Sequence, residues 1–301
     1  MKLSDVFFVP RFEAYLTSEK KVSPHTVKAY TSDIISLLNY LNDKFETQAP
    51  AEVTHLLIKS WLSELMANGM DARSINRKIS SLKTYYKYLL KHRLVDKDPM
   101  LKVTSPKTSK KLPVFIDESK MTEIVDSFVD EKSDEKNEVN HGIANDILLT
   151  LYHTGMRLSE LIHLEKRHID MSQDTIKVLG KRNKERIIPI TGELKVVLSA
   201  RSNDHPASPY VFNTSEGKKL YPNFVYRSVK QLLSQHTTLK KKSPHVLRHT
   251  FATHLLNNGG DLNAIKELLG HANLSATQVY THNSVERLKK IHQQAHPKGK
   301  H

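Results

Sequence analysis

Apolar residues recur at helical spacing in three segments of the first hundred residues. In each of them an apolar side chain returns every three or four positions, which is the period of an amphipathic α-helix. Ser23 and Thr54 stand where N-caps belong, and Gly69 is a stop signal. The pattern therefore predicts a helical N-terminal domain. The three segments are residues 23–41, 54–69 and 71–93.

The third segment carries two faces of different character. Its apolar stripe predicts a buried side, whereas its other side holds six cations and hydroxyls at steps of three or four residues. Both kinds of group bind phosphates, so we expect this face to contact nucleic acid, with Arg73, Arg77, Lys87 and Lys91 as binding residues. The alternative is an ordinary solvated face. The six residues are Arg73, Arg77, Ser80, Thr84, Lys87 and Lys91.

A long apolar helix is predicted to end at Thr154-Gly155, where a second helix follows. Arg157 falls in the first turn of that second helix, and Glu160, three residues on, can hold its guanidinium. Further along, strand-like alternation on both sides of Gly180 predicts a β-hairpin with Lys181 at its tip. A lone arginine or an exposed lysine in such places is usually a plain surface residue.

Ser243 and Pro244 predict the start of another helix, whose first turns carry His245 and Arg248 on one face. A helix N-terminus favours anions through its free N–H groups and its dipole. The competing interpretation is a zinc site, because His245 and His249 have i, i+4 spacing. No glutamate follows the first histidine and no third ligand is evident, which speaks against zinc.

The stretch LGHANLSATQVYTH closes the series. A helix is predicted to end at Gly270, His271 follows in the turn, and Ser275 can cap a short polar helix that carries Tyr280. Tyr280 is either a core residue or an exposed phenol with a chemical role.

Charge and composition point to a polyanionic partner. The 301 residues have a formal net charge of +14 and a pI near 9.6. Residues 1–107 hold 17 Lys and Arg against 11 Asp and Glu, and the rest hold 29 against 21, so both parts are basic. A polyanion gripped by two domains fits this balance, although an ordinary basic protein has the same charge. We expect a domain at 1–103, a basic linker at 104–113 and a catalytic domain at 114–301.

Several classes of protein lack support in this sequence. There is no cysteine for a disulfide or thiolate–zinc site, no apolar run of membrane-spanning length, and no signal-peptide pattern. A glycine-rich phosphate loop is absent as well. We therefore expect a cytoplasmic protein that needs no nucleotide, metal or other cofactor.

The candidate residues together suit the chemistry of a phosphodiester. Arginines can clamp the non-bridging oxygens of a phosphate in flight, histidines can exchange protons, and lysine can protonate a leaving alkoxide. Tyrosine, with a free pKa of about 10, becomes a nucleophile where cations favour its phenolate. The set comprises Arg157, Lys181, His245, Arg248, His271 and Tyr280.

Four stretches resemble the motifs of the tyrosine recombinase (phage integrase) family, in order and at similar spacing. They are TGMRLSEL, GKRNKERIIPI, HVLRHTFATHLL and LGHANLSATQVYTH. The resemblance covers the whole chain and is strongest to the Xer group, whose terminal segments look like SPHTVKAYTSDI and ERLKKIHQQAHP. It implies a mainly α fold: a helical, SAM-like core-binding domain and a helical catalytic domain with a small antiparallel β-sheet.

The resemblance also implies roles. Tyr280 is the expected nucleophile of a 3′-phosphotyrosyl intermediate, and the other five residues surround the scissile phosphate. The expected function is site-specific recombination through a Holliday junction, resolving chromosome dimers at a terminus site. The partners implied are double-stranded DNA, a homo- or hetero-tetramer with a second recombinase, and a septal DNA translocase. Alternatives are a mobile-element integrase, a DNA-binding protein that no longer cuts, and, remotely, a zinc hydrolase.

The C-terminal segment after Ser284 offers only Val285, Leu288 and Ile291 as an apolar strip. That is too little for an independent helix, so we expect it to be ordered by docking. The family resemblance implies docking on a neighbouring protomer, and the alternative is a tail folded on its own domain.

Overall fold

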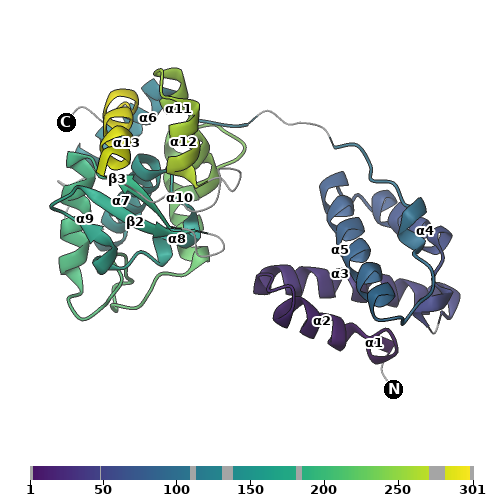
Figure 1. Ribbon diagram of the computed structural model, residues 1–301. Coiled ribbons are helices and arrows are strands. Elements are labelled where there is room, and N and C mark those ends of the chain that lie inside the picture. Colours follow the sequence, from purple (N-terminus) through teal and green to yellow (C-terminus); the bar gives the residue numbers. More distant parts are fainter. Residues whose placement is uncertain are drawn as a thin grey trace. The chain divides into compact units, whose positions relative to one another are not determined.

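The computed structural model describes residues 3–47, 49–108, 113–130, 138–180, 185–270 and 282–298. The chain divides into two compact units, Met1–Lys111 and Leu112–His301, each with its own core (Figure 1). Within the described residues, no helix is both long enough and apolar enough to cross a membrane.

The first unit is helical. Thr54 accepts a hydrogen bond from the N–H of Leu57 and Ser23 accepts one from Thr26, so both predicted N-caps are confirmed. Gly69 follows the end of its helix with a φ of 83°, a conformation that glycine adopts without strain. The helices are α1 (Leu3–Val6), α2 (Val9–Ser18), α3 (Pro24–Phe45), α4 (His55–Ala67) and α5 (Ala72–Lys91), with 3₁₀ turns at Pro50–Glu52 and Pro99–Lys102.

Helix α5 packs against α3 and α4 and contributes the centre of this core. The predicted stripe of Ile75, Ile79, Leu82, Tyr86 and Leu89 is buried throughout, which confirms the spacing argument. The apolar face of α5 thus fixes which side of the helix remains for other contacts.

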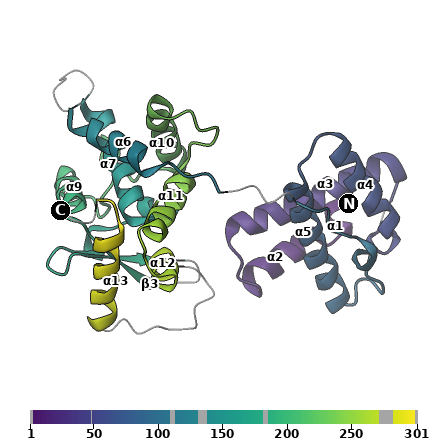
Figure 2. The same ribbon diagram turned by 90° about the horizontal axis from the view of Figure 1, so that it is seen from above.

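The second unit combines helices with a three-stranded antiparallel sheet, and α12 and α13 lie beside strand β3 (Figure 2). Strands β2 and β3 pair from Thr175↔Pro189 to Leu179↔Glu185, so the predicted hairpin is confirmed, while residues 181–184 lie outside the described residues. The elements are α6 (Glu118–Asp130), α7 (Glu138–Thr154), α8 (Leu158–Ile162), a 3₁₀ turn (Lys166–His168), β1 (Ile169–Asp170), β2 (Thr175–Leu179), β3 (Glu185–Pro189), α9 (Gly192–Asp204), α10 (Pro222–His236), α11 (Pro244–Asn257), α12 (Leu262–Leu269) and α13 (His282–Ala295).

Helix α7 is the central helix of this unit, because α9, α10 and α11 all pack on it. Its residues Ile147, Leu148 and Leu151 are fully buried in the larger of the two apolar clusters of this unit. The mainly helical fold with a small antiparallel sheet is therefore confirmed.

The C-terminal helix α13 packs on α11, α12 and β3 of its own unit. Leu288 is buried and Ile291 packs beside it against Phe251 and Leu268. The family resemblance implies docking on a neighbouring protomer; in the single chain Leu288 and Ile291 pack on apolar side chains of their own unit, as the alternative expects. Docking on a second protomer stays a prediction.

Candidate active site

Arg157 stands at a break between two helices. Helix α7 ends at Thr154, Gly155 turns the chain with a φ of 57°, and Arg157 is the N-cap of α8, just ahead of the first turn in which it was predicted. The Glu160 carboxylate accepts from the backbone N–H of Arg157 at 2.6 Å and from its guanidinium at 2.8 Å. The predicted Arg157–Glu160 contact is confirmed.

Arg248 reaches the same place from α11. Its guanidinium donates to the carbonyl oxygen of Gly155 at 2.6 Å and to that of Leu269. Gly155 permits this approach, because a Cβ built there would lie 2.4 Å from the Phe251 ring of α11. Glycine is required at this break for its positive φ and for the close packing of α11.

Arg186 of β3 is a third guanidinium in the site. Its side chain is nearly fully buried and donates two parallel hydrogen bonds of 2.8 Å to the two oxygens of Glu160. Its Nε donates to the carbonyl of Leu268 at 2.7 Å. Such a two-pronged contact fixes both position and orientation of the carboxylate.

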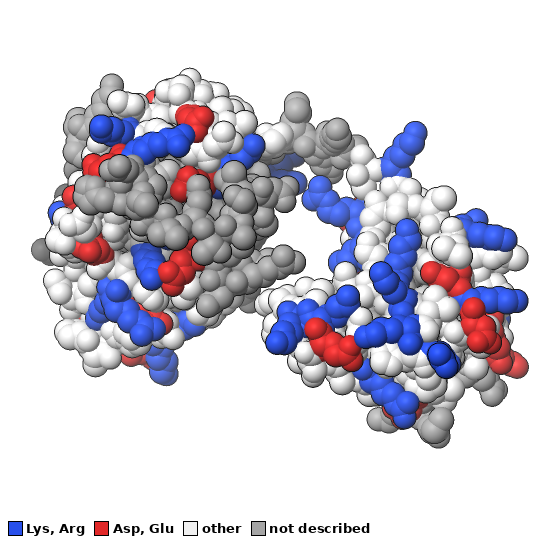
Figure 3. All heavy atoms as spheres, in the orientation of Figure 1, with Lys and Arg blue, Asp and Glu red and all other residues white. Residues whose placement is uncertain are grey.

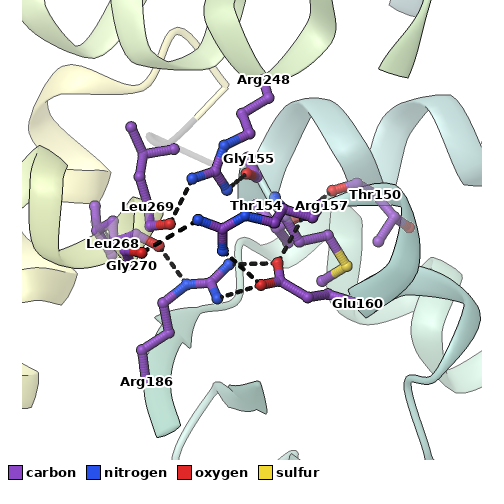
Figure 4. A network of polar contacts seen from close by, with 11 residues as sticks. Thr150, Thr154, Gly155, Arg157, Glu160, Arg186, Arg248, Leu268, Leu269 and Gly270 are labelled. Atoms are coloured by element: carbon purple, nitrogen blue, oxygen red, sulfur yellow. Dashed lines mark hydrogen bonds and ion pairs between the residues drawn. The ribbon is translucent and has the colours of Figure 1, made fainter. Parts of the chain in front are cut away.

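The three guanidiniums bind three successive carbonyls at the end of α12 (Figure 4): Arg186 binds Leu268, Arg248 binds Leu269 and Arg157 binds Gly270. Carbonyls in the last turn of a helix lack intrahelical partners and carry partial negative charge. The three arginines therefore bind the end of α12, directly before residues 271–281 in the chain.

The pKa values of two side chains in this cluster, Glu160 and Arg248, are shifted. Burial alone raises the pKa of Glu160, but hydrogen bonds and charge from Arg186, with those from Arg157, outweigh it and lower the pKa to about 2. Burial, with the charges of Arg157 and Arg186, lowers the pKa of Arg248 to about 10. At neutral pH the four side chains are thus all charged, which leaves a net charge of +2.

The other candidate residues fall into two groups. His245 is exposed in the first turn of α11, near Arg248. Lys181, His271 and Tyr280 lie outside the described residues, as does the predicted cap Ser275.

The start of α11 differs from the prediction in one detail. Ser243 occupies the N-cap position, but its side chain makes no capping hydrogen bond. His249, the partner of His245 in the zinc alternative, has a pKa lowered by burial and by the charges of His245 and Arg248. Within the described residues no three His, Asp or Glu side chains converge as metal ligands.

The expected nucleic-acid face of α5 is exposed, but it is not free of acids. Arg73, Arg77, Lys87 and Lys91 all reach the surface. Arg77 nevertheless pairs with buried Asp33 of α3, and Lys91 donates at 3.1 Å to Glu19, the residue that follows α2. Neighbouring helices therefore bring acids to a face that has none in its own segment.

The visible surface of the first unit is rich in lysine and arginine. Acidic side chains form smaller groups among them (Figure 3). A surface that mixes the two signs with an excess of cations is compatible with both interpretations of the α5 face, so the DNA-contacting role stays a prediction.

Arg186 is a site residue that the sequence analysis missed. It lies in the stretch ERIIPI, where two consecutive isoleucines obscure the alternation of the strand. The available signal is that Arg186 shares a strand face with Ile188, which is fully buried. An arginine on a buried face requires an acidic partner, and Glu160 is that partner.

Two family models match the chain. The model of the phage integrase family matches residues 115–287, and that of the phage integrase N-terminal SAM-like domain matches residues 9–93. The chain belongs to the phage integrase family. It is thus a tyrosine recombinase, an enzyme of site-specific recombination that cuts and rejoins DNA strands, as the sequence resemblance predicts.

Known tyrosine recombinases resemble this family member along nearly its whole length. Tyrosine recombinase XerC of Bacillus pumilus is 37% identical over 306 residues, covering 96% of this chain and 95% of its own. Tyrosine recombinase XerC of Chlorobaculum parvum is 35% identical over 316 residues, covering 95% of this chain and 93% of its own.

Solved structures share the tyrosine recombinase fold. The XerH recombinase in a post-cleavage complex with a palindromic difH substrate has a TM-score of 0.70 at 20% identity, covering 94% of this chain and 83% of its own. A lambda integrase dimer bound to a COC′ core site has a TM-score of 0.69 at 16% identity, covering 91% and 98%. These likenesses confirm the predicted fold class.

Proposed function

We propose that this recombinase cuts a recombination site in double-stranded DNA, with Tyr280 as nucleophile and Arg157, Lys181, His245, Arg248 and His271 around the scissile phosphate. One observation carries the proposal. Two arginines from separate places in the chain, Arg157 ahead of α8 and Arg248 of α11, bind consecutive carbonyls immediately before the segment that holds His271 and Tyr280.

The two arginines suit the non-bridging oxygens of a phosphodiester. Each guanidinium has five N–H donors, and the contacts of Arg157 and Arg248 among the described residues use two of each. Donors thus remain for a phosphate. The net charge of +2 matches the charge of a five-coordinate phosphorus, which exceeds that of the ground state by about one unit.

The reaction follows from these roles. The phenolate of Tyr280 attacks phosphorus and forms a 3′-phosphotyrosine while the bond to the 5′-oxygen breaks, and Lys181 protonates that oxygen. His245 and His271 stabilise the added charge and exchange protons. The bond energy stays in the phosphotyrosine, so rejoining needs no nucleotide.

Tyr280→Phe tests the nucleophile. The ring remains and only the hydroxyl is lost, so we expect near-normal DNA affinity and no covalent complex on a nicked duplex that carries a terminus site. The wild-type chain should form a denaturant-resistant adduct on the same DNA. An adduct formed by the Phe variant excludes Tyr280 as the nucleophile, and a wild-type chain that binds the DNA but forms none supports a binding protein that no longer cuts.

The biological role we propose is that of the Xer group: a tetramer, alone or with a second recombinase, that resolves chromosome dimers in the cytoplasm through a Holliday junction, under a septal DNA translocase. The relatives named tyrosine recombinase XerC, similar over nearly the whole chain, support it. Loss of the gene should leave unresolved chromosome dimers in dividing cells. The alternative, a mobile-element integrase, predicts normal chromosome segregation and excision of flanking DNA.

A further inference from the structure

Glu160 is placed so that it could neutralise the arginine it positions. Its side chain is 4% exposed and touches the guanidinium of Arg157 at 2.8 Å, so a lone pair of these two residues would have no net charge. A carboxylate beside a phosphate-binding arginine competes with the phosphate for that cation. Something must compensate the charge of Glu160 if Arg157 is to bind DNA phosphate.

Arg186 has the geometry for that compensation. It faces both oxygens of Glu160 at 2.8 Å, while Arg157 reaches one of them with its guanidinium. Both partners of the Arg186–Glu160 pair are 4% exposed, so water screens the pair little. Arg186 itself is too buried to meet a DNA phosphate, which separates its role from that of Arg157.

The third hydrogen bond of Arg186 extends its reach to α12. Its Nε holds the carbonyl of Leu268, two residues before the carbonyl that Arg157 binds. Arg186 is also the second residue of β3, in the hairpin whose predicted tip carries Lys181. The Arg186 side chain therefore connects the hairpin with Glu160, which binds Arg157, and with the end of α12.

We propose that Arg186 is a positioning residue for the phosphate site: it neutralises Glu160, so that Arg157 keeps its charge for the scissile phosphate, and it anchors the end of α12. The proposal rests on the proposed function, in which Arg157 binds that phosphate. The quantity that matters is the net charge of Arg157, Glu160, Arg186 and Arg248. With Arg186 the four side chains carry +2, without it they carry +1, and without both Arg186 and Glu160 they carry +2 again.

A charge-rescue experiment tests this arithmetic. The variants are Arg186→Met, which keeps the stem and removes the charge, and the double variant Glu160→Gln with Arg186→Met. The matched control is Arg201→Met, since Arg201 of α9 also pairs with carboxylates, Asp146 of α7 at 2.6 Å and Asp204 of α9 at 2.8 Å, and takes no part in the arginine cluster. Single-turnover cleavage of a nicked duplex, affinity for the same duplex and melting temperature are measured on the full chain.

We expect Arg186→Met to slow cleavage by roughly 10- to 100-fold, the loss typical of a residue that orients a binding group, with DNA affinity nearly unchanged. The double variant should recover most of that rate, although it too lacks the bond to Leu268. Arg201→Met should cleave normally. A double variant as slow as Arg186→Met, or an Arg186→Met chain of wild-type rate, overturns the proposal.

Two outcomes need separate readouts. If Arg186→Met does not fold, the double variant decides alone, because it contains no unpaired buried charge; cleavage within about tenfold of wild type supports the proposal, and any larger loss overturns it. If the wild-type chain cuts no DNA, tungstate serves as the probe and its binding is measured by calorimetry. Only the part of the heat that is lost in Arg157→Met is counted as binding to this site. Weaker binding in Arg186→Met, restored in the double variant, supports the role of Arg186 although the proposed cleavage fails; unchanged binding overturns it.

Discussion

His292 lies inside a group of buried histidines at the point where α13 attaches to its unit. Its Nε2 donates to the carbonyl of His153 in α7 at 2.8 Å, and its ring stacks on that of His296 at 5.0 Å. Its Nδ1 has no hydrogen-bond partner among the described residues. His292 contacts His153 and His296 directly, and these two histidines in turn meet other titratable groups: Tyr152 of α7 packs on His296 and binds His254 of α11, and Glu193 of α9 pairs with His153.

These surroundings disfavour a charged imidazole. Burial, with the nearby His153, lowers the pKa of His292 to about 4, although the bond to the His153 carbonyl opposes this. Burial also lowers the pKa of His296 well below 6.5. A base whose pKa is depressed in the docked state binds protons better when undocked. Docking is therefore fully stable above about pH 6.5 and weakens as the pH falls toward the docked pKa.

The size of the effect follows from these values. For a free pKa of about 6.5 and a docked pKa of about 4, a fall from about pH 7 to about pH 5 weakens docking through His292 by about 2 kcal/mol, or roughly 20-fold. His296 adds to this loss. His292→Gln removes the titration of His292 and leaves an amide N–H that can reach the His153 carbonyl.

Hydrogen exchange of the α13 amides, corrected for intrinsic rates, measures the docking equilibrium at each pH. Between about pH 7 and pH 5 the wild-type protection should fall about 20-fold further than that of His292→Gln. His25→Gln, which changes an exposed histidine of the first unit, should follow the wild type. Parallel curves for wild type and His292→Gln would refute the assignment, because His292 would then not titrate in this range.

Two further pairs of substitutions test the α5 face and the break at Gly155. Lys87→Ala should weaken DNA binding and reduce the slope of log affinity against log salt by about one, at unchanged melting temperature. Arg77→Ala should have the same effect on binding and should also lower the melting temperature, because it deprives buried Asp33 of a partner. Equal melting temperatures for the two variants would contradict this. Gly155→Ala should destabilise the chain more than Gly259→Ala, because both glycines have positive φ but only the first would meet the Phe251 ring; similar losses on thermal melting would show that the ring yields.

The features that depend on residues close together in the chain were mostly predicted from the sequence. The stripe on α5, the caps at Ser23 and Thr54, and the break at Gly155 follow from spacing and backbone preference within a few residues. The contact of Arg157 with Glu160 belongs to the same class, since residues three apart at a helix start are neighbours. The helical segments, the hairpin and the Arg157–Glu160 part of the arginine cluster were accessible in this way, whereas the two-domain fold with its small sheet came from the family resemblance.

The rest depends on contacts between residues far apart in the chain. Asp33 meets Arg77 across 44 positions, and Arg186 meets Leu268 across 82. Periodicity within α5 or β3 carries no information about which acid or carbonyl arrives from another element. The absence of acids on the α5 segment therefore did not mean an absence of acids on its surface.

The arrangement of the arginines also answers how such a site can exist before DNA binds. Three like charges gathered in one cluster repel one another, and Glu160 cancels only one of them. The remaining compensation comes from the end of α12, whose Leu268, Leu269 and Gly270 carbonyls each take one guanidinium. These backbone dipoles hold the cations in place at little cost of reorganisation, since the helix supplies them in every state in which it is folded. Each of the three guanidiniums is thus held by a carbonyl at the end of α12, so unfolding of α12 would take one hydrogen-bond partner from each arginine.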